Sequence, residues 1–191
     1  MNKKNLKYTI FLVIIIIVLF FASIGIIMIG KKDSEVKVNP EDVKFSSDSN
    51  TVIIKNIISV SEDFGKNISE ENGGAFGYLK FSVTNKTTEK RDFQIYITKN
   101  DVASKEINSN YITFYLTDSD DNPFDNYTGN KLPTYNDFKY IKDKADSKSI
   151  YTGTLDVKEK KNFTLRVWID DSYLVVGDEE IFSFEIGARA V

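Results

Sequence analysis

The densest group of side chains that can do chemistry lies between Asp118 and Asp125, where the chain reads DSDDNPFD. Carboxylates at alternate positions suit Ca²⁺, because their oxygens can converge on one hard cation. The EF-hand register fails, since counting Asp118 as position one places Pro123 where glycine is needed and Gly129 where the bidentate glutamate belongs. We therefore interpret the segment as a solvated loop, with Asp118, Asp120 and Asp125 as the ligands if calcium binds.

Two other segments superficially resemble ligand-binding or catalytic sites. Residues 72–77, NGGAFG, are glycine-rich like a phosphate loop, but they precede a predicted strand and no Gly-Lys-Ser/Thr follows, so we interpret them as a flexible turn. Asp170-Asp171 and the acids at 178–180 have the residue types of a glycosidase pair. They fall at the ends of predicted strands, where acids commonly solvate turns, and we assign no catalytic residue there.

Outward-facing aromatic side chains are the remaining candidates for a binding surface. Tyr78, Tyr111 and Tyr115 fall on the polar faces of predicted strands, where a wall polymer or a protein partner can stack on them. Tyrosine is also a good strand former, so the same pattern is expected of a sheet without a ligand.

Composition excludes several classes of chemistry. The 191 residues include no cysteine and no histidine, so there is no disulfide, no zinc site of the usual Cys/His kind and no Ser-His or Cys-His dyad. The formal net charge is −3, and it is more negative after residue 30 because Lys3, Lys4 and Lys7 all precede that point. We expect no nucleic-acid partner, no cofactor, no metal site and no enzyme activity.

The N-terminal region predicts a membrane anchor. Residues 10–29 read IFLVIIIIVLFFASIGIIMI, which carries no charge and is long enough to cross a bilayer as a helix. The run exceeds a signal-peptide core, and the small residues Ser23 and Gly25 are followed by further apolar residues, so we expect a signal-anchor helix over 10–30 that is not cleaved. The lysines before it predict a cytoplasmic segment 1–9 and an extracytoplasmic C-terminal domain.

The rest of the chain predicts one mainly β domain. Residues 31–50 are polar and form a tether, with a short strand expected around Val43 to Phe45. Residues 51–191 alternate apolar and polar side chains between turn-forming residues, which predicts an antiparallel β-sandwich of the Ig-like or jelly-roll-like kind, with a barrel as the alternative. Minor helical insertions are expected at 135–141 and 102–107. The predicted strands lie within 51–60, 78–84, 93–97, 112–116, 163–169 and 182–186.

The amino-acid composition indicates the kind of host organism. Lysine far outnumbers arginine, and Ile and Asn are plentiful, which is typical of an AT-rich genome such as that of a low-GC Gram-positive bacterium. The Asn-x-Ser/Thr triplets occur about as often as chance gives in so Asn-rich a chain, so we do not interpret them as glycosylation sites. They begin at Asn67, Asn85, Asn126 and Asn162.

Residues 149–186 resemble the closing strands of TasA/camelysin-like bacterial surface domains, the biofilm-matrix family. The pattern is a strand and polar turn, an alternating strand that ends in a tryptophan, a loop with a glycine, and a last strand. The resemblance implies a sandwich fold and a surface setting. The chain has no His-Glu-x-x-His, so protease activity ascribed to the camelysin branch does not carry over. The matching residues are Gly153, Phe163, Leu165, Val167, Trp168, Gly177, Phe182 and Phe184.

Together these features predict a single-pass protein of the cell membrane that displays an extracytoplasmic β-sandwich. We expect a non-catalytic role in binding, adhesion or envelope architecture, with a protein or cell-wall partner. The alternative is a secreted matrix subunit that assembles through β-strand addition after signal cleavage.

Overall fold

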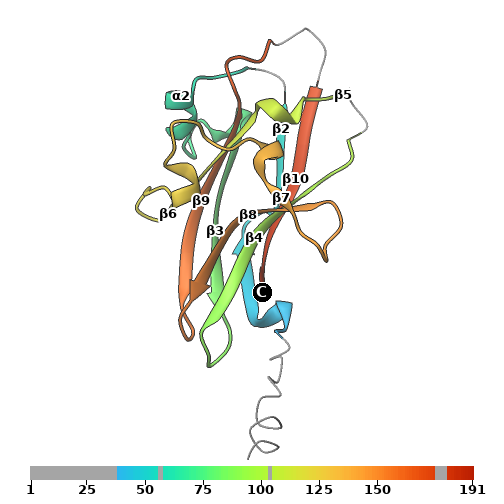
Figure 1. Ribbon diagram of the computed structural model, residues 1–191. Helices are drawn as coiled ribbons and strands as arrows, with labels where there is room; N and C mark the ends of the chain where they lie inside the picture. Colours follow the sequence, from blue (N-terminus) through green and yellow to red (C-terminus); the bar gives the residue numbers. More distant parts are fainter. Residues whose placement is uncertain (1–37, 56–57, 103–104, 175–179) are drawn as a thin grey trace, which may run out of the picture. The chain divides into compact units, whose positions relative to one another are not determined.

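The computed structural model describes residues 38–55, 58–102, 105–174 and 180–191 as two packed β-sheets (Figure 1). The four-stranded sheet has the order β1-β3-β9-β6, and the six-stranded sheet has the order β2-β10-β4-β8-β7 with β5 beside β10. All pairs are antiparallel except β5 with β10.

The four-stranded sheet comprises β1 (Val43–Ser47), β3 (Gly77–Asn85), β9 (Lys160–Ile169) and β6 (Ile112–Asp118). The other comprises β2 (Thr51–Lys55), β10 (Glu180–Ala190), β4 (Arg91–Lys99), β8 (Ser147–Leu155), β7 (Lys139–Tyr140) and β5 (Lys105–Glu106).

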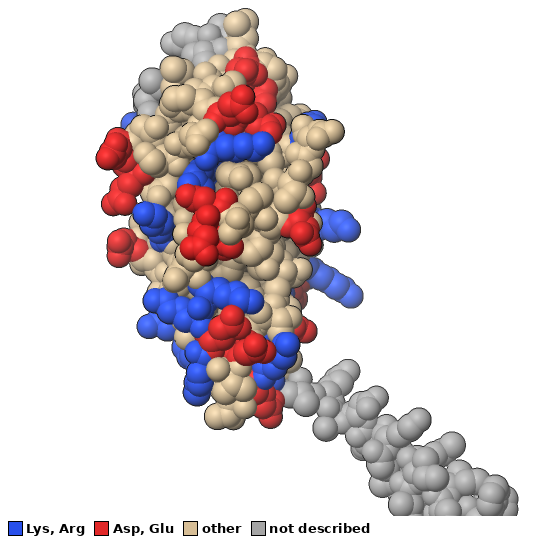
Figure 2. All heavy atoms as spheres, turned by 90° about the vertical axis from the view of Figure 1, so that its left-hand side faces the viewer, with Lys and Arg blue, Asp and Glu red and all other residues tan. Residues whose placement is uncertain are grey.

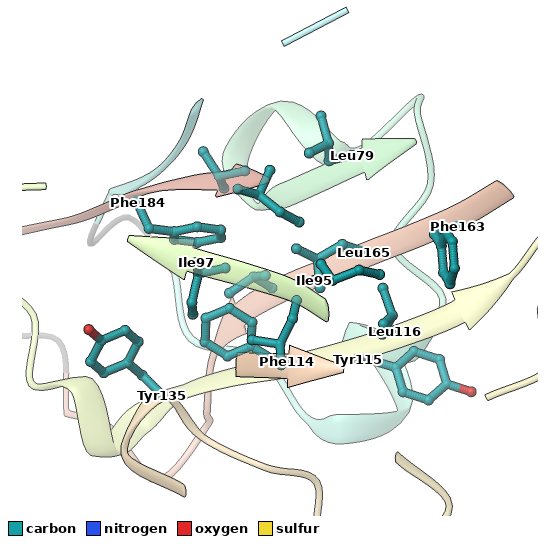
Figure 3. Close-up of a cluster of buried hydrophobic side chains, with 14 of the residues drawn as sticks. Leu79, Ile95, Ile97, Phe114, Tyr115, Leu116, Tyr135, Phe163, Leu165 and Phe184 are labelled. Atoms are coloured by element: carbon teal, nitrogen blue, oxygen red, sulfur yellow. The ribbon is translucent and has the colours of Figure 1, made fainter. Parts of the chain in front are cut away.

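This arrangement confirms the predicted antiparallel sandwich and excludes the barrel, because the strands form two separate sheets. Alternation explains the core: inward side chains of both sheets interdigitate, as Figure 3 shows for Ile95, Phe114, Leu165 and their neighbours. These three side chains are fully buried, as expected for the inner faces of a sandwich.

Within the described residues, helical structure is confined to short insertions, as predicted for the β domain. They are α2 (Glu62–Lys66) and the 3₁₀ turns η1 (Pro40–Asp42), η2 (Gly73–Ala75), η3 (Ser109–Tyr111), η4 (Asp125–Tyr127) and η5 (Tyr135–Asp137). The helical spacing over 135–141 produces only η5, because the chain then continues into β7. The expected turn at 102–107 is wrong in its described part, where Lys105 and Glu106 pair with β10 as β5.

The outer face of β9 departs from the sequence expectation. The alternation of residues 163–169 places Arg166 and Trp168 on the polar face of this strand, opposite Leu165 and Val167, whereas both are buried. The segment between β2 and β3 crosses this face, and α2 brings Gly65 directly onto the indole of Trp168. Alternation within a strand cannot reveal such a cover, because the covering residues belong to another segment of the chain.

Residues 38–191 form one compact unit, so this fragment has its own hydrophobic core. The strand expected around Val43 is present as β1, within the segment predicted as a tether. The span predicted over 10–30 lies outside the described residues. Within them, no helix combines the length and the apolar character needed to cross a membrane.

Candidate functional site

The candidate site is a groove at the side of the sandwich, between β8 and the loop that follows β6. Two adjoining hollows of about 320 and about 500 Å³ share Asn126, Tyr151 and Thr152 in their walls. We call them together the seam groove, because they follow the line where the two sheets meet. Its other walls include Phe124, Asp125, Pro133, Asp137, Phe138 and Lys139.

Backbone contacts hold the loop side of the groove against β6. Asp118 ends β6 and its carboxylate accepts hydrogen bonds from the N–H groups of Asp120 (2.8 Å) and Asn122 (2.9 Å), which closes a tight turn. The chain then returns along β6, where the Phe124 N–H donates to the carbonyl of Leu116 at 3.5 Å. This return places Phe124 and the residues after it opposite β8.

Aromatic packing joins the loop to β8. The rings of Phe124 and Tyr151 lie 4.5 Å apart, and both pack against Phe163 of the core. The buried Tyr127 hydroxyl donates to the carbonyl of Ile150 at 2.8 Å. The half-buried rings of Phe124 and Tyr151 therefore have fixed positions and form an apolar wall of the groove.

Polar side chains that are free to bind a ligand stand beside this wall. Asp125 and Asn126 are exposed, and their side chains make no hydrogen bond within the part of the chain that the structure describes. Burial, followed by the charge of Asp125, raises the pKa of Tyr151 above its ordinary value, so its hydroxyl remains a donor at neutral pH. Aromatic surface next to a carboxylate, an amide and hydroxyls can hold a ligand that is apolar on one face and hydroxyl-rich at its edges.

The alternative that residues 118–125 bind calcium receives no support from the structure. Two backbone N–H groups occupy the Asp118 carboxylate, and Asp121 pairs with Arg166 at 2.7 Å instead of facing the other acids. Among the described residues, no three carboxylates are grouped so as to hold a metal ion.

The remaining sequence candidates are used within the fold or lie outside the described residues. The Asn72–Gly77 segment forms η2 and runs into β3, as expected of a turn. Asp170 accepts hydrogen bonds from the N–H and hydroxyl of Ser172, which caps a turn. Residues 178 and 179 fall outside the described chain, and Glu180 binds Lys105 and the Tyr173 hydroxyl.

The tyrosines predicted as a stacking surface contact their own chain. Tyr115 is 9% exposed and lies beneath Lys66 of α2, so its ring is not available to a partner. Tyr78 is half-buried beside the Arg166 guanidinium, and the Tyr111 ring lies 5.0 Å from that of Tyr173. Sequence reasoning missed Tyr151 because none of the strands predicted from alternation covers β8. A β-bulge at Ile150, opposite Ile95 and Tyr96 of β4, also interrupts the alternation of β8.

A third hollow of about 480 Å³ lies on the four-stranded sheet, with Ser46, Lys80, Phe81 and Phe163 among its walls. Its walls combine serine and threonine hydroxyls with Phe81 and Phe163, and Lys80 is already paired with Glu70 at 3.5 Å. Figure 2 shows acidic and basic side chains interspersed over the side it displays, without an extended area of one sign. We place the candidate site in the seam groove, where the closely packed rings of Phe124 and Tyr151 stand beside the exposed side chains of Asp125 and Asn126.

Comparison with known proteins leaves the family open. No protein-family model matches the chain, and no curated protein is similar to it. One solved structure, described as CpGH89CBM32-5 from Clostridium perfringens in complex with GalNAc-β-1,3-galactose, is 12% identical and aligns with 77% of this chain and 96% of its own. Its TM-score of 0.21 is too low to support an inference about either fold or ligand. The resemblance of residues 149–186 to the TasA/camelysin family therefore stays a prediction, although β8, β9 and β10 do follow one another there.

Proposed function

We propose that this protein is a membrane-anchored binding protein without catalytic activity, whose extracytoplasmic β-sandwich binds its ligand in the seam groove. The observation that carries the proposal is the fixed pair of rings, Phe124 and Tyr151, beside the uncommitted side chains of Asp125 and Asn126. An ordered apolar wall next to polar groups without internal partners is the arrangement of a binding surface.

The chemistry of the groove favours a hydroxyl-rich polymer of the cell envelope, such as a wall polysaccharide. A sugar ring presents C–H groups that can pack on an aromatic ring, while its hydroxyls can donate to the Asp125 carboxylate and accept from the Asn126 amide. A charged polymer fits less well, because Asp125, Asp137 and Lys139 give the groove carboxylates and an ammonium group close together.

Binding can be tested with the fragment 38–191 and cell-wall sacculi of a Gram-positive bacterium that retain their polysaccharide. We expect the fragment to cosediment with the sacculi, and we expect Asp125→Asn combined with Asn126→Ala to weaken retention at least tenfold. Asp120→Asn is the matched control, since it removes a carboxylate from the same loop outside the groove. Equal retention of all three proteins, or no retention of any, would count against the proposal.

The proposed topology rests on the sequence, and protease shaving of intact cells tests it. Digestion of the full-length protein from outside, with an N-terminal fragment retained in the membrane, is the expected result. A released species that begins near Ile26 or Lys31 would contradict the uncleaved anchor. Complete protection would contradict the extracytoplasmic location.

A second candidate function is that of a matrix subunit which assembles by strand addition. The observation in its favour is the C-terminal half of β1, where the outward backbone groups of Phe45 and Ser47 have no hydrogen-bond partner within the described chain. Sheet edges of this kind are where β-strands from other chains add.

A further inference from the structure

The third hollow, of about 480 Å³, spans three strands of the four-stranded sheet. The strand register places Ser46 of β1 opposite Ser82 of β3, and Ser82 opposite Asn162 of β9. Neighbouring strands lie about 5 Å apart, so these three side chains form a row at that spacing on the outer face of the sheet. In the next row Lys80 lies opposite Thr164. We call this hollow the sheet trough.

The hydroxyl and amide groups of the sheet trough have no partner within their own chain. The side chains of Ser46, Ser82, Asn162 and Thr164 make no hydrogen bond to any other described residue. Ser82 and Thr164 are each only 6% exposed and form the floor, whereas Asn162 is exposed at the rim. Neither floor hydroxyl is among the fully buried polar atoms that lack a partner in the described chain, where Trp168 Nε1 stands alone. Both hydroxyls are therefore open to the trough and available to a ligand.

The sheet trough and the seam groove meet at one turn of the chain. Ser119 belongs to the wall of the trough, and Pro123 at the other end of the same turn belongs to the wall of the groove. Phe163 connects the two from the core, because it is a wall residue of the trough and its ring lies 5.4 Å from that of Phe124 in the groove. The two hollows are therefore neighbours on the surface.

We propose that the sheet trough is a second subsite for the polymer that the seam groove binds, so that one hydroxyl-rich chain occupies both hollows. The identity of the ligand rests on the proposed function of the groove. The trough adds that the ligand is an extended chain, because a single sugar cannot fill two hollows on either side of a turn.

The side chains of the sheet trough suit a neutral chain that is rich in hydroxyls. Serine and threonine hydroxyls both donate and accept hydrogen bonds, and the Asn162 amide offers two donors and an acceptor. An apolar ligand would leave these groups without partners. A polyanion fits less well, because Asp48 lies in the wall and Lys80, the basic residue of the wall, is already paired with Glu70 at 3.5 Å.

Two neighbouring subsites make the affinity depend on the length of the polymer. A fragment of a few sugars occupies one hollow at a time. A longer chain that is held in one hollow presents its next segment to the other at a high effective concentration, which raises the overall affinity without any new kind of contact.

Cosedimentation of the fragment 38–191 with polysaccharide-bearing sacculi tests the second subsite. Ser46→Ala combined with Asn162→Ala removes one hydroxyl and one amide from the trough, and we expect retention to fall about tenfold as the contribution of the second subsite is lost. Thr88→Ala combined with Asn130→Ala is the matched control, since it removes an exposed hydroxyl and an exposed amide that line neither hollow. Equal retention of the two double variants would overturn the proposal.

Chain length provides the second test. Polysaccharide is released from the same sacculi by mild acid, separated by length and titrated calorimetrically into the fragment 38–191. Wild-type protein is expected to bind long chains at least about tenfold more tightly than fragments of a few sugars. The S46A/N162A variant should lose most of this preference and bind the short fragments as the wild-type protein does. An equal preference for long chains in both proteins would contradict a second subsite.

The two proposed subsites can fail separately. If D125N/N126A is retained like the wild-type protein while S46A/N162A is not, the trough stands as a polymer site and the groove proposal fails. If D125N/N126A loses retention and S46A/N162A keeps it, the groove stands and the second subsite is overturned. Absence of retention for the wild-type fragment would overturn both.

Discussion

Gly65 lies directly against the indole of Trp168, so closely that a Cβ on Gly65 would stand 2.2 Å from the Trp168 Cε2 atom. This contact is possible only for glycine, and it allows α2 to cover the outer face of β9. The burial of Trp168, which is 0% exposed, thus depends on the absence of a side chain at a position more than a hundred residues earlier.

Substitution of Gly65 tests this contact. Gly65→Ala is expected to lower the free energy of unfolding by about 1–3 kcal/mol, because the added methyl group must displace a packed indole. Chemical denaturation followed by Trp168 fluorescence measures the change, since the chain has a single tryptophan. Gly74→Ala is the control, because nothing lies within 4 Å of its Cβ position. Equal effects of the two substitutions would contradict the packing.

Arg166 joins the segment between β2 and β3 to the four-stranded sheet, and all three nitrogens of its guanidinium donate hydrogen bonds. It donates to the Ile68 carbonyl at 2.7 Å, the Thr117 hydroxyl at 3.2 Å and the Asp121 carboxylate at 2.7 Å. Arg166→Lys keeps the charge but cannot reach all these acceptors, so we expect a loss of about 2 kcal/mol in unfolding free energy.

The control for Arg166 is Arg189, which within the described chain lacks hydrogen bonds to buried acceptors such as those of Arg166 to the Ile68 carbonyl and the Thr117 hydroxyl. Arg189 forms two hydrogen bonds with Asp143, whose side chain is largely exposed. Arg189→Lys should cost less than about 1 kcal/mol in the same denaturation experiment. A larger loss at Arg189 than at Arg166 would show that burial does not govern these contacts.

Stability at high pH is expected to depend on buried tyrosines. Burial raises the pKa of Tyr127 strongly and that of Tyr135 to about 12, whereas both ionise near 10 in the unfolded chain. Protons are then held more tightly by the folded state, so unfolding free energy should fall as pH rises from 10 toward 12. The pKa of Lys148 is lowered by burial, which contributes the opposite slope just below its ordinary value of 10.5.

The variant Tyr127→Phe separates these contributions. It should reduce the fall in stability above pH 10 and cost about 1 kcal/mol at neutral pH, because the hydrogen bond to the Ile150 carbonyl is lost. Tyr140→Phe is the control, since that side chain is 69% exposed. Denaturation series at several pH values provide the measurement, and unchanged slopes in Y127F would contradict the assignment.

A corresponding prediction concerns Asp137 and the unfolding free energy at acid pH. Its carboxylate accepts from the N–H and hydroxyl of Thr134, both at 2.8 Å, and the backbone hydrogen bond lowers the pKa of Asp137 below its ordinary 3.8. The stabilisation is present above 3.8 and is lost as pH falls through the lower folded value. Asp137→Asn should therefore flatten the acid-side loss and cost about 1 kcal/mol at neutral pH. An acid-side loss of stability in D137N equal to that of the wild-type protein would contradict the assignment.

The alternation of apolar and polar residues by itself determined the sandwich. Sets such as Phe93, Ile95 and Ile97 must lie on one side of a sheet because side chains alternate along a strand, and the structure buries all three. The turn at 72–77 was equally predictable from its glycines, because it leads into a strand. In both cases the information is local in the sequence: the period of the side chains along a strand, and the glycines of the turn.

Only the tertiary structure decided which polar faces are covered and where the candidate site lies. Trp168 and Arg166 lie on the face of β9 that the alternation marks as polar, yet a segment about a hundred positions earlier in the chain buries them. Phe124 and Tyr151 are separated by 26 intervening residues and meet because the loop after β6 turns back along its own strand. A period of two specifies the face of a strand, but what packs on that face depends on the path of the rest of the chain.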